Sequence, residues 1–327
     1  MKIVFNTNYK SAASFMGIDQ MIPMLEKAGH EVKRNDWKNY QDYDVAFFMS
    51  PDSQVLKAKK KNPNILTGII DPKTVSFWSR IRHKSLWNQP IMQELKAADF
   101  LLVSSLEHRD YMLKFNKNPF VIYFFPETPK EKKQHTEKSK IIISYHGNKV
   151  HLDSMGDVSW ALDKLAEKYD IELMAIYNIQ KLGKWQANRP KKCKVSDIQW
   201  APNMAENLKK CDIGISPSMQ SANKKPNYIF RFKYSNGPGR LYPFAMLGIP
   251  VVADASPSQS QFIQNEVSGF VCCTREAWYE NLERLIKDAN LRTIQGKNLY
   301  NFVETNFSIE KNFQRLMEFI KNLKTSK

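Results

Sequence analysis

Short apolar runs alternate with helix-patterned segments over almost the whole chain, and this alternation constrains the fold more than any other feature. Ahead of Gly29, for example, apolar residues recur at helical spacing at Phe15, Ile18, Met21, Ile22 and Leu25. Strands alternating with helices are typical of parallel sheets that helices cover on both faces. We therefore predict an α/β protein with strands at residues 2–6, 30–34, 45–49, 65–70, 100–103, 120–124, 141–145, 171–176, 198–200, 213–216, 250–253 and 269–273.

One polar segment divides this series of strands into two. Residues 127–139 are rich in Pro, Lys and Glu and have almost no apolar side chains, which is typical of a linker. A chain of 327 residues also fits two domains of ordinary size. We predict an N-terminal Rossmann-like domain at 1–126, an exposed linker at 127–139, and a C-terminal domain at 140–327 that closes with three helices. The cleft between two such domains is the expected ligand site.

The formal net charge of +16 indicates an anionic partner. No zinc finger, recognition helix or RNA-binding signature accompanies the charge, so we do not expect nucleic-acid binding. The four cysteines (Cys193, Cys211, Cys272 and Cys273) have neither a C-x-x-C nor a zinc spacing, so no metal site is expected and a reducing cytoplasm fits them. No run is long enough to span a membrane, and the chain starts on a strand. We expect a cytoplasmic protein whose basic surface suits peripheral contact with the anionic inner face of a membrane.

The segment 233–252 is the strongest candidate for a binding site. A glycine-rich turn with cations at Lys233 and Arg240 leads into a helix pattern that stops at Gly248, before an apolar strand. Backbone N–H groups of such a turn, at Asn236, Gly237 and Gly239, form an anion site together with the helix dipole. The two cations could then neutralise a diphosphate. An ordinary loop–helix–strand unit with a glycine cap accounts for the pattern equally well.

Several pieces in the second half resemble, in the right order, the nucleotide-sugar-binding domain of GT-B glycosyltransferases of the family 4 or family 1 type. They are residues 141–148, 198–202, 208–217, 236–252, 268–270 and 278–303. More loosely, residues 97–105 resemble the last-strand region of the family's N-terminal domain. The resemblance implies two Rossmann-like domains facing across a cleft. It also implies metal-independent transfer of a sugar from a nucleotide-diphosphate-sugar to a glycan or lipid-linked acceptor, as in cell-surface polysaccharide biosynthesis, with no cofactor beyond the donor.

The resemblance also assigns roles to individual residues. Lys233, Arg240 and the turn at 236–239 would hold the phosphates, while Asn148 and Lys149 would touch phosphate or sugar next to Gly147, where the backbone can approach a ligand. Trp200 and Ala201 would lie beside the base, although the pattern favours Trp200 as a core residue. The family often has two glutamates separated by seven residues in the donor loop, but this chain has Ser235 and Pro243 there. The ribose and sugar contacts of the family therefore do not transfer.

Catalysis without a metal needs groups from the protein, and no Asp-x-Asp triplet appears at the end of a strand. His146 is a candidate hydrogen-bond donor to the substrate or, alternatively, a structural histidine. Asp71, which follows a strand, is the first candidate for the base of an inverting reaction, ahead of Glu107 and His108; helix caps and surface charges are the alternatives. The aromatic and basic segment 75–87 could contact an acceptor or a membrane. A nucleotide-sugar 2-epimerase and a non-catalytic binding subunit remain alternative functions.

Overall fold

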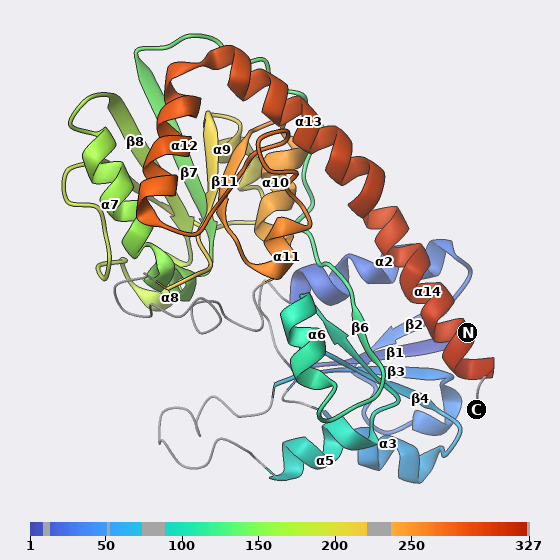
Figure 1. The fold of residues 1–327 in the computed structure, drawn as a ribbon. Helices are drawn as coiled ribbons and strands as arrows, with labels where there is room; N and C mark the ends of the chain where they lie inside the picture. The colour runs from blue at the N-terminus through green and yellow to red at the C-terminus, as the bar shows by residue number, and fades with distance from the viewer. Residues whose placement is uncertain (9–13, 51–52, 74–88, 221–236, 326–327) are drawn as a thin grey trace. The chain divides into compact units, whose positions relative to one another are not determined.

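The structure is a computed structural model that describes residues 1–8, 14–50, 53–73, 89–220 and 237–325. The chain forms two compact units. Unit 1 consists of Met1–Phe124 and Ile309–Lys327, and unit 2 of Phe125–Ser308. Each unit is built on one six-stranded sheet, in which all pairs of neighbouring strands are parallel (Figure 1). The predicted α/β class with two doubly wound sheets is confirmed.

The sheet of unit 1 has the order β2-β1-β3-β4-β5-β6. All residues of β3, β4 and β5 are buried, as expected for central strands covered on both faces. The strands are β1 Lys2–Asn6, β2 Glu31–Arg34, β3 Val45–Met49, β4 Leu66–Ile70, β5 Phe100–Val103 and β6 Pro119–Val121. The helices are η1 Phe15–Asp19, α2 Met21–Lys27, η2 Tyr40–Asp42, α3 Val55–Lys61, α5 Gln89–Ala97, α6 Leu106–Met112 and α14 Ile309–Thr325.

The last helix, α14, belongs to unit 1 although it ends the chain. Leu316 and Ile320 are fully buried in the core of that unit, together with residues of β1, β3, β4 and β5. The ring of Phe319 stacks on Phe120 at 4.4 Å and meets Phe100 edge-on at 5.7 Å. The prediction of a single C-terminal domain at 140–327 is therefore wrong for residues 309–327. The apolar face of this helix completes the first sheet's core.

The sheet of unit 2 has the order β12-β11-β10-β7-β8-β9. Its strands are β7 Lys140–Gly147, β8 Asp170–Tyr177, β9 Lys194–Gln199, β10 Ile213–Ser216, β11 Val251–Asp254 and β12 Phe270–Cys272. Its helices are η3 Lys149–Ser154, α7 Gly156–Leu165, α8 Ile179–Leu182, α9 Ala205–Leu208, η5 Pro238–Arg240, α10 Leu241–Met246, α11 Pro257–Ser260, α12 Arg275–Lys287 and α13 Ala289–Phe307.

Alternation along β10 separates the two covered faces of this sheet. Ile213 and Ile215 pack into the core formed with α7 and α12, which lie side by side in Figure 1. Gly214, between them, faces the other way, and a Cβ there would lie 2.6 Å from the ring of Phe244 on α10. The small residue thus lets α10 approach the sheet closely, directly beside the candidate site.

The predicted linker at 127–139 has no helix or strand, and the structure attaches it to unit 2. Its backbone N–H groups at Glu131 and Lys133 donate to the carbonyls of Met246 and Leu247. The Lys133 ammonium donates to the carbonyl of Lys209 at 3.0 Å, and also to that of Cys211. Most residues of this segment are exposed, but these hydrogen bonds hold it along unit 2, so it does not stand apart as a free linker.

Candidate functional site

The sheet of unit 2 reverses its winding direction between β7 and β10. From β7 the chain moves outward through β8 and β9, then returns to β10 on the other side of β7 and continues to β11 and β12. In open α/β sheets such a reversal leaves a crevice outside the carboxyl ends of the two strands, where ligands bind. In this sheet the crevice would lie beside the segments that follow Gly147, at the end of β7, and Ser216, at the end of β10.

Arg240 lies at this point and contacts both strand ends. Its guanidinium Nη2 donates to the carbonyl of Pro217, directly after β10, at 2.9 Å. The guanidinium carbon also lies 5.7 Å from the ring centre of Tyr145 on β7, within the range of a cation–π contact. The structure thus brings the arginine of the glycine-rich turn to the carboxyl end of the sheet.

Gly147 is the residue that permits this approach. Its φ of +146° lies in a region that favours glycine, and an added Cβ would lie 2.8 Å from the Tyr145 hydroxyl and 3.0 Å from Arg240 Cδ. The Tyr145 hydroxyl donates to the carbonyl of Asn148 at 2.9 Å. Any side chain at 147 would therefore disturb both the arginine and the turn that follows β7.

His146 binds the backbone of Arg240 through a hydrogen bond. Its Nε2 lies 2.7 Å from the Arg240 carbonyl, which can only accept, so the Nε2 atom carries the proton. The ring meets Phe244 edge-on at 5.1 Å and is 3 % exposed. Burial lowers the pKa of His146 to about 4, so the imidazole is neutral at pH 7. This arrangement fits a positioning residue better than a group that touches substrate.

The residues after β7 form a short capped turn. Asn148 is exposed, and its side chain accepts from the N–H of Val150 at 3.1 Å, which caps η3. The Lys149 ammonium donates to the carbonyl of Leu182, which ends α8, at 2.5 Å. Lys149 is half-buried at the carboxyl edge of the sheet. Lys149 and Arg240 are thus the predicted phosphate-binding cations that lie within the described residues.

The other predicted donor-side residues divide into three groups. Gly237 and Gly239 lie at the start of η5 and within it, immediately before Arg240 and α10. Lys233 and Asn236 lie outside the described residues. Trp200 and Ala201 follow β9, and both are half-buried, so the Trp200 ring is not part of the fully buried core.

Asp254 ends β11 and was not predicted as a site residue. Its Oδ2 atom accepts from the backbone N–H groups of Ser218 at 2.6 Å and Met219 at 2.7 Å, and its Oδ1 atom accepts from Trp278 Nε1 at 2.9 Å. Burial raises the pKa of Asp254 to about 6, opposed by these donors. The only signal in the sequence is a carboxylate directly after an apolar strand.

In unit 1, Asp71 follows the carboxyl end of β4. It has a φ of +49°, uncommon for a residue other than glycine, and pairs with the Lys73 ammonium at 2.8 Å. The buried ring of His108, a second candidate, lies with Nε2 3.0 Å from the carbonyl of Pro72. Burial lowers the pKa of His108, and the nearby Asp71 carboxylate partly offsets this shift. Glu107 is also buried, in the first turn of α6.

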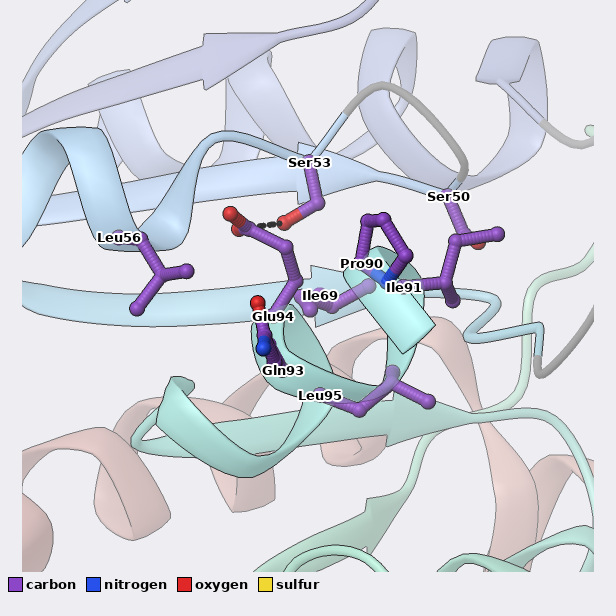
Figure 2. A pocket seen from close by; sticks show the side chains of 9 residues that line it. All are labelled: Ser50, Ser53, Leu56, Ile69, Pro90, Ile91, Gln93, Glu94 and Leu95. Carbon is purple, nitrogen blue, oxygen red and sulfur yellow. Dashed lines mark hydrogen bonds between the residues drawn. The ribbon is translucent and has the colours of Figure 1, made fainter. Parts of the chain in front are cut away.

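A hollow of about 200 Å³ lies beside this turn in unit 1 (Figure 2). Ser50, at the end of β3, lines it, and the Ser50 hydroxyl also accepts from the N–H of Lys73 at 3.2 Å. Figure 2 shows Ser53 pointing toward Glu94, to whose carboxylate its hydroxyl donates at 2.8 Å. The rest of the lining is mostly apolar and comes from α3, β4 and α5: Leu56, Ile69, Pro90, Ile91, Gln93 and Leu95.

Two kinds of feature are absent from the described ranges. Among these residues, no cluster of three or more His, Cys, Asp or Glu side chains is arranged to hold a metal ion. None of the described helices has the length and apolar character needed to cross a membrane.

The chain matches no protein-family model and no curated protein sequence. Solved structures do match it. Sucrose-phosphate synthase from Thermosynechococcus elongatus has a TM-score of 0.66 and 12% identity over 100% of both chains. A glycosyltransferase from Rickettsia africae has a TM-score of 0.65 and 14% identity over 98% of each chain. HepE from Anabaena, in complex with UDP-glucose, has a TM-score of 0.62 and 14% identity over 98% of this chain and 100% of its own. The chain therefore has the GT-B fold of these proteins.

Proposed function

We propose that this protein is a glycosyltransferase that binds a nucleotide-diphosphate-sugar in unit 2 and transfers the sugar to a hydroxyl of a glycan or lipid-linked acceptor. The observation that carries the proposal is the position of Arg240. Its guanidinium is fixed at the carboxyl ends of β7 and β10, where sheets of this kind bind ligands.

Glycosyl transfer leaves a diphosphate, so the site must stabilise negative charge that develops on it. The planar guanidinium of Arg240 can donate to two phosphate oxygens at once. A carbonyl oxygen and the Tyr145 ring hold it in place, and neither carries a negative charge. Contacts of this kind orient a guanidinium without offsetting its charge, which suits a diphosphate site. We assign Lys149, Lys233 and the turn at 236–239 to the same diphosphate.

The proposal extends to the base and the sugar of the donor. HepE, which shares the fold, is described in complex with UDP-glucose, so uridine is the first base to test. Trp200 and Ala201, at the carboxyl end of β9, are the residues we assign to the base side. Pro243 is buried in α10 where the family often has a glutamate, so sugar recognition must use other groups.

For the acceptor side we propose Asp71 as the base that takes the proton of the attacking hydroxyl. Asp71 follows the carboxyl end of β4 and pairs with Lys73. The backbone N–H of Lys73 in turn donates to the hydroxyl of Ser50, which lines the hollow of Figure 2. The hollow combines hydroxyl, amide and carboxylate groups with apolar side chains, which suits a hydroxylated acceptor with an apolar part. The net charge of +16 supports the further proposal that the protein docks on an anionic membrane carrying such an acceptor.

Calorimetry with uridine, guanosine, cytidine and thymidine diphosphates tests the donor site directly. We expect one of them to bind the wild-type protein and Arg240→Ala to weaken it by about tenfold or more, because a hydrogen bond to a charged group contributes about 1.5–3 kcal/mol. Arg284→Ala is the matched control, since Arg284 also lies over a ring, that of Phe270, at 4.5 Å. Equal affinity in wild type and Arg240→Ala would refute the site.

A non-catalytic binding subunit is the second candidate, and the buried Pro243 in place of an acidic residue favours it. Both candidates bind a nucleoside diphosphate, so binding does not separate them. Product analysis does: consumption of the sugar donor only with an acceptor present indicates a transferase, conversion of the donor alone indicates an epimerase, and no turnover with any acceptor indicates a binding subunit.

A further inference from the structure

We propose that Asp254 is a positioning residue for Arg240 and that it acts through a single peptide group. The inference rests on the proposed function, because the role that Asp254 supports is the contact of Arg240 with a diphosphate. Asp254 ends β11 and Arg240 ends η5, and the link between them is the peptide that joins Pro217 to Ser218.

Both residues bind this one peptide group. Its carbonyl, from Pro217, accepts from the Arg240 guanidinium at 2.9 Å, and its N–H, from Ser218, donates to the Asp254 carboxylate at 2.6 Å. A peptide group is planar, and in the trans form its C=O and N–H point in opposite directions. The carboxylate and the guanidinium therefore hold opposite edges of the same rigid unit, and rotating that unit weakens both contacts.

The carboxylate is a stiff anchor. Its Oδ2 atom also accepts from the N–H of Met219 at 2.7 Å, and the indole of the fully buried Trp278 donates to Oδ1. Asp254 itself is 3 % exposed, so these hydrogen bonds are shielded from water, where they are stronger than at a surface. With both oxygens engaged, the side chain cannot rotate without losing buried contacts.

The indirect connection has a chemical advantage. A carboxylate directly on Arg240 would offset the charge that the diphosphate needs, whereas a peptide carbonyl orients the guanidinium without neutralising it. Asp254 thus supplies rigidity one peptide away from the cation. Because the arginine is already oriented, less ordering is needed when an anion binds.

The test is calorimetry of uridine diphosphate, or of whichever diphosphate the wild type binds, with variants of the full chain. Asp254→Ala removes the acceptor for Ser218 and should weaken binding by about tenfold. Asp254→Asn should retain affinity within about threefold, because its amide oxygen can still accept from Ser218 and Met219. Asp212→Ala is the matched control: it also removes a buried carboxylate of unit 2 that accepts from a backbone N–H, that of Ile142 at 3.0 Å, but this carboxylate does not bind the Pro217–Ser218 peptide, so we expect wild-type affinity within about threefold.

A double-mutant cycle separates positioning from general destabilisation. In the Arg240→Ala background, Asp254→Ala should cause no further loss, because the arginine it positions is gone. Equal losses in both backgrounds, or wild-type affinity in Asp254→Ala, would overturn the inference. If Asp254→Ala does not fold, Ser218→Pro deletes the same N–H and should give the same loss; normal affinity in that variant would equally overturn it. Failure of the proposed function is distinguishable, because then Arg240→Ala alone would leave affinity unchanged.

Discussion

Replacing Gly147 by alanine is the sharpest single test of the site's geometry. Two costs add at this position. The positive φ of +146° strains any side chain by about 1–3 kcal/mol, and displacing the Tyr145 hydroxyl from 2.8 Å loses its hydrogen bond to Asn148, which contributes about 1 kcal/mol. We expect unit 2 to lose about 2–4 kcal/mol of unfolding free energy.

The same substitution should also weaken binding, because the new methyl group meets Arg240 Cδ at 3.0 Å and moves the guanidinium. A shift that breaks one charged hydrogen bond corresponds to a loss of about tenfold in affinity. Gly183→Ala is the control: its φ is +70°, but its Cβ would meet only Lys149 Nζ at an ordinary 3.8 Å.

Chemical denaturation of each variant gives the unfolding free energy, and calorimetry with the bound nucleoside diphosphate gives the affinity. Gly183→Ala should lose about 1–3 kcal/mol of unfolding free energy from its φ alone and keep the wild-type affinity, so about tenfold in affinity separates the two variants. The reasoning would be refuted if Gly147→Ala folded and bound the diphosphate as tightly as Gly183→Ala, since Arg240 could then move without consequence.

Three further predictions concern other parts of the molecule. Asp71→Asn should lower the transfer rate by about 10²–10⁴-fold while diphosphate affinity stays at the wild-type value, as measured by initial rates and calorimetry. The pKa of about 4 for His146 lies below the unfolded value of 6.5, so its contribution to stability is present above pH 6.5 and is lost as pH falls toward 4, by up to about 3 kcal/mol. In His146→Gln the unfolding free energy should therefore fall less between pH 6.5 and pH 4 than in the wild type. The same fall in both proteins would contradict a neutral His146 imidazole. Leu316→Ala should destabilise unit 1, not unit 2, by about 2–5 kcal/mol, seen as faster hydrogen exchange in the strands of unit 1.

The strands could be predicted closely because most of them are buried on both faces and appear as continuous apolar runs. β3 and β5 have the predicted bounds. β9 was placed too late, at 198–200 instead of Lys194–Gln199, because this edge strand is half-exposed and mixes Lys, Ser, Asp and Gln with its apolar residues. Periodicity detects burial, so an edge strand gives the weakest signal.

The partners of α14 and of the segment at 127–139 could not be predicted from sequence. An amphipathic helix shows that one of its faces is buried, but not against which sheet, and α14 turns back to the first. Likewise, the composition of a polar segment rich in lysine does not show what the segment binds. Its residues are mostly exposed, yet the Lys138 ammonium lies 2.7 Å from the buried carboxylate of Asp212. In both cases the decisive contacts join residues far apart in the chain.

The same distinction between local and long-range contacts explains which residues of the candidate site could be predicted. Arg240 was found because a glycine turn followed by a helix is a local pattern, and the structure places it at a strand switch. The neutral state of His146 depends on burial beneath that turn, which no local pattern reveals. Asp254 is a single carboxylate after a strand, and only the fold shows that three donors converge on it.

These contacts together explain how a cation can be held rigidly and still attract an anion. His146 binds the Arg240 backbone as a neutral donor, and the peptide carbonyl of Pro217 binds its guanidinium as a neutral acceptor. The carboxylate of Asp254 is separated from the guanidinium by a whole peptide group. Coulomb attraction falls with distance, so Asp254 offsets little of the arginine's charge while its hydrogen bonds fix the geometry. Neutral contacts that orient the guanidinium, with Asp254 one peptide group away, are what binding a diphosphate and releasing it after transfer would require.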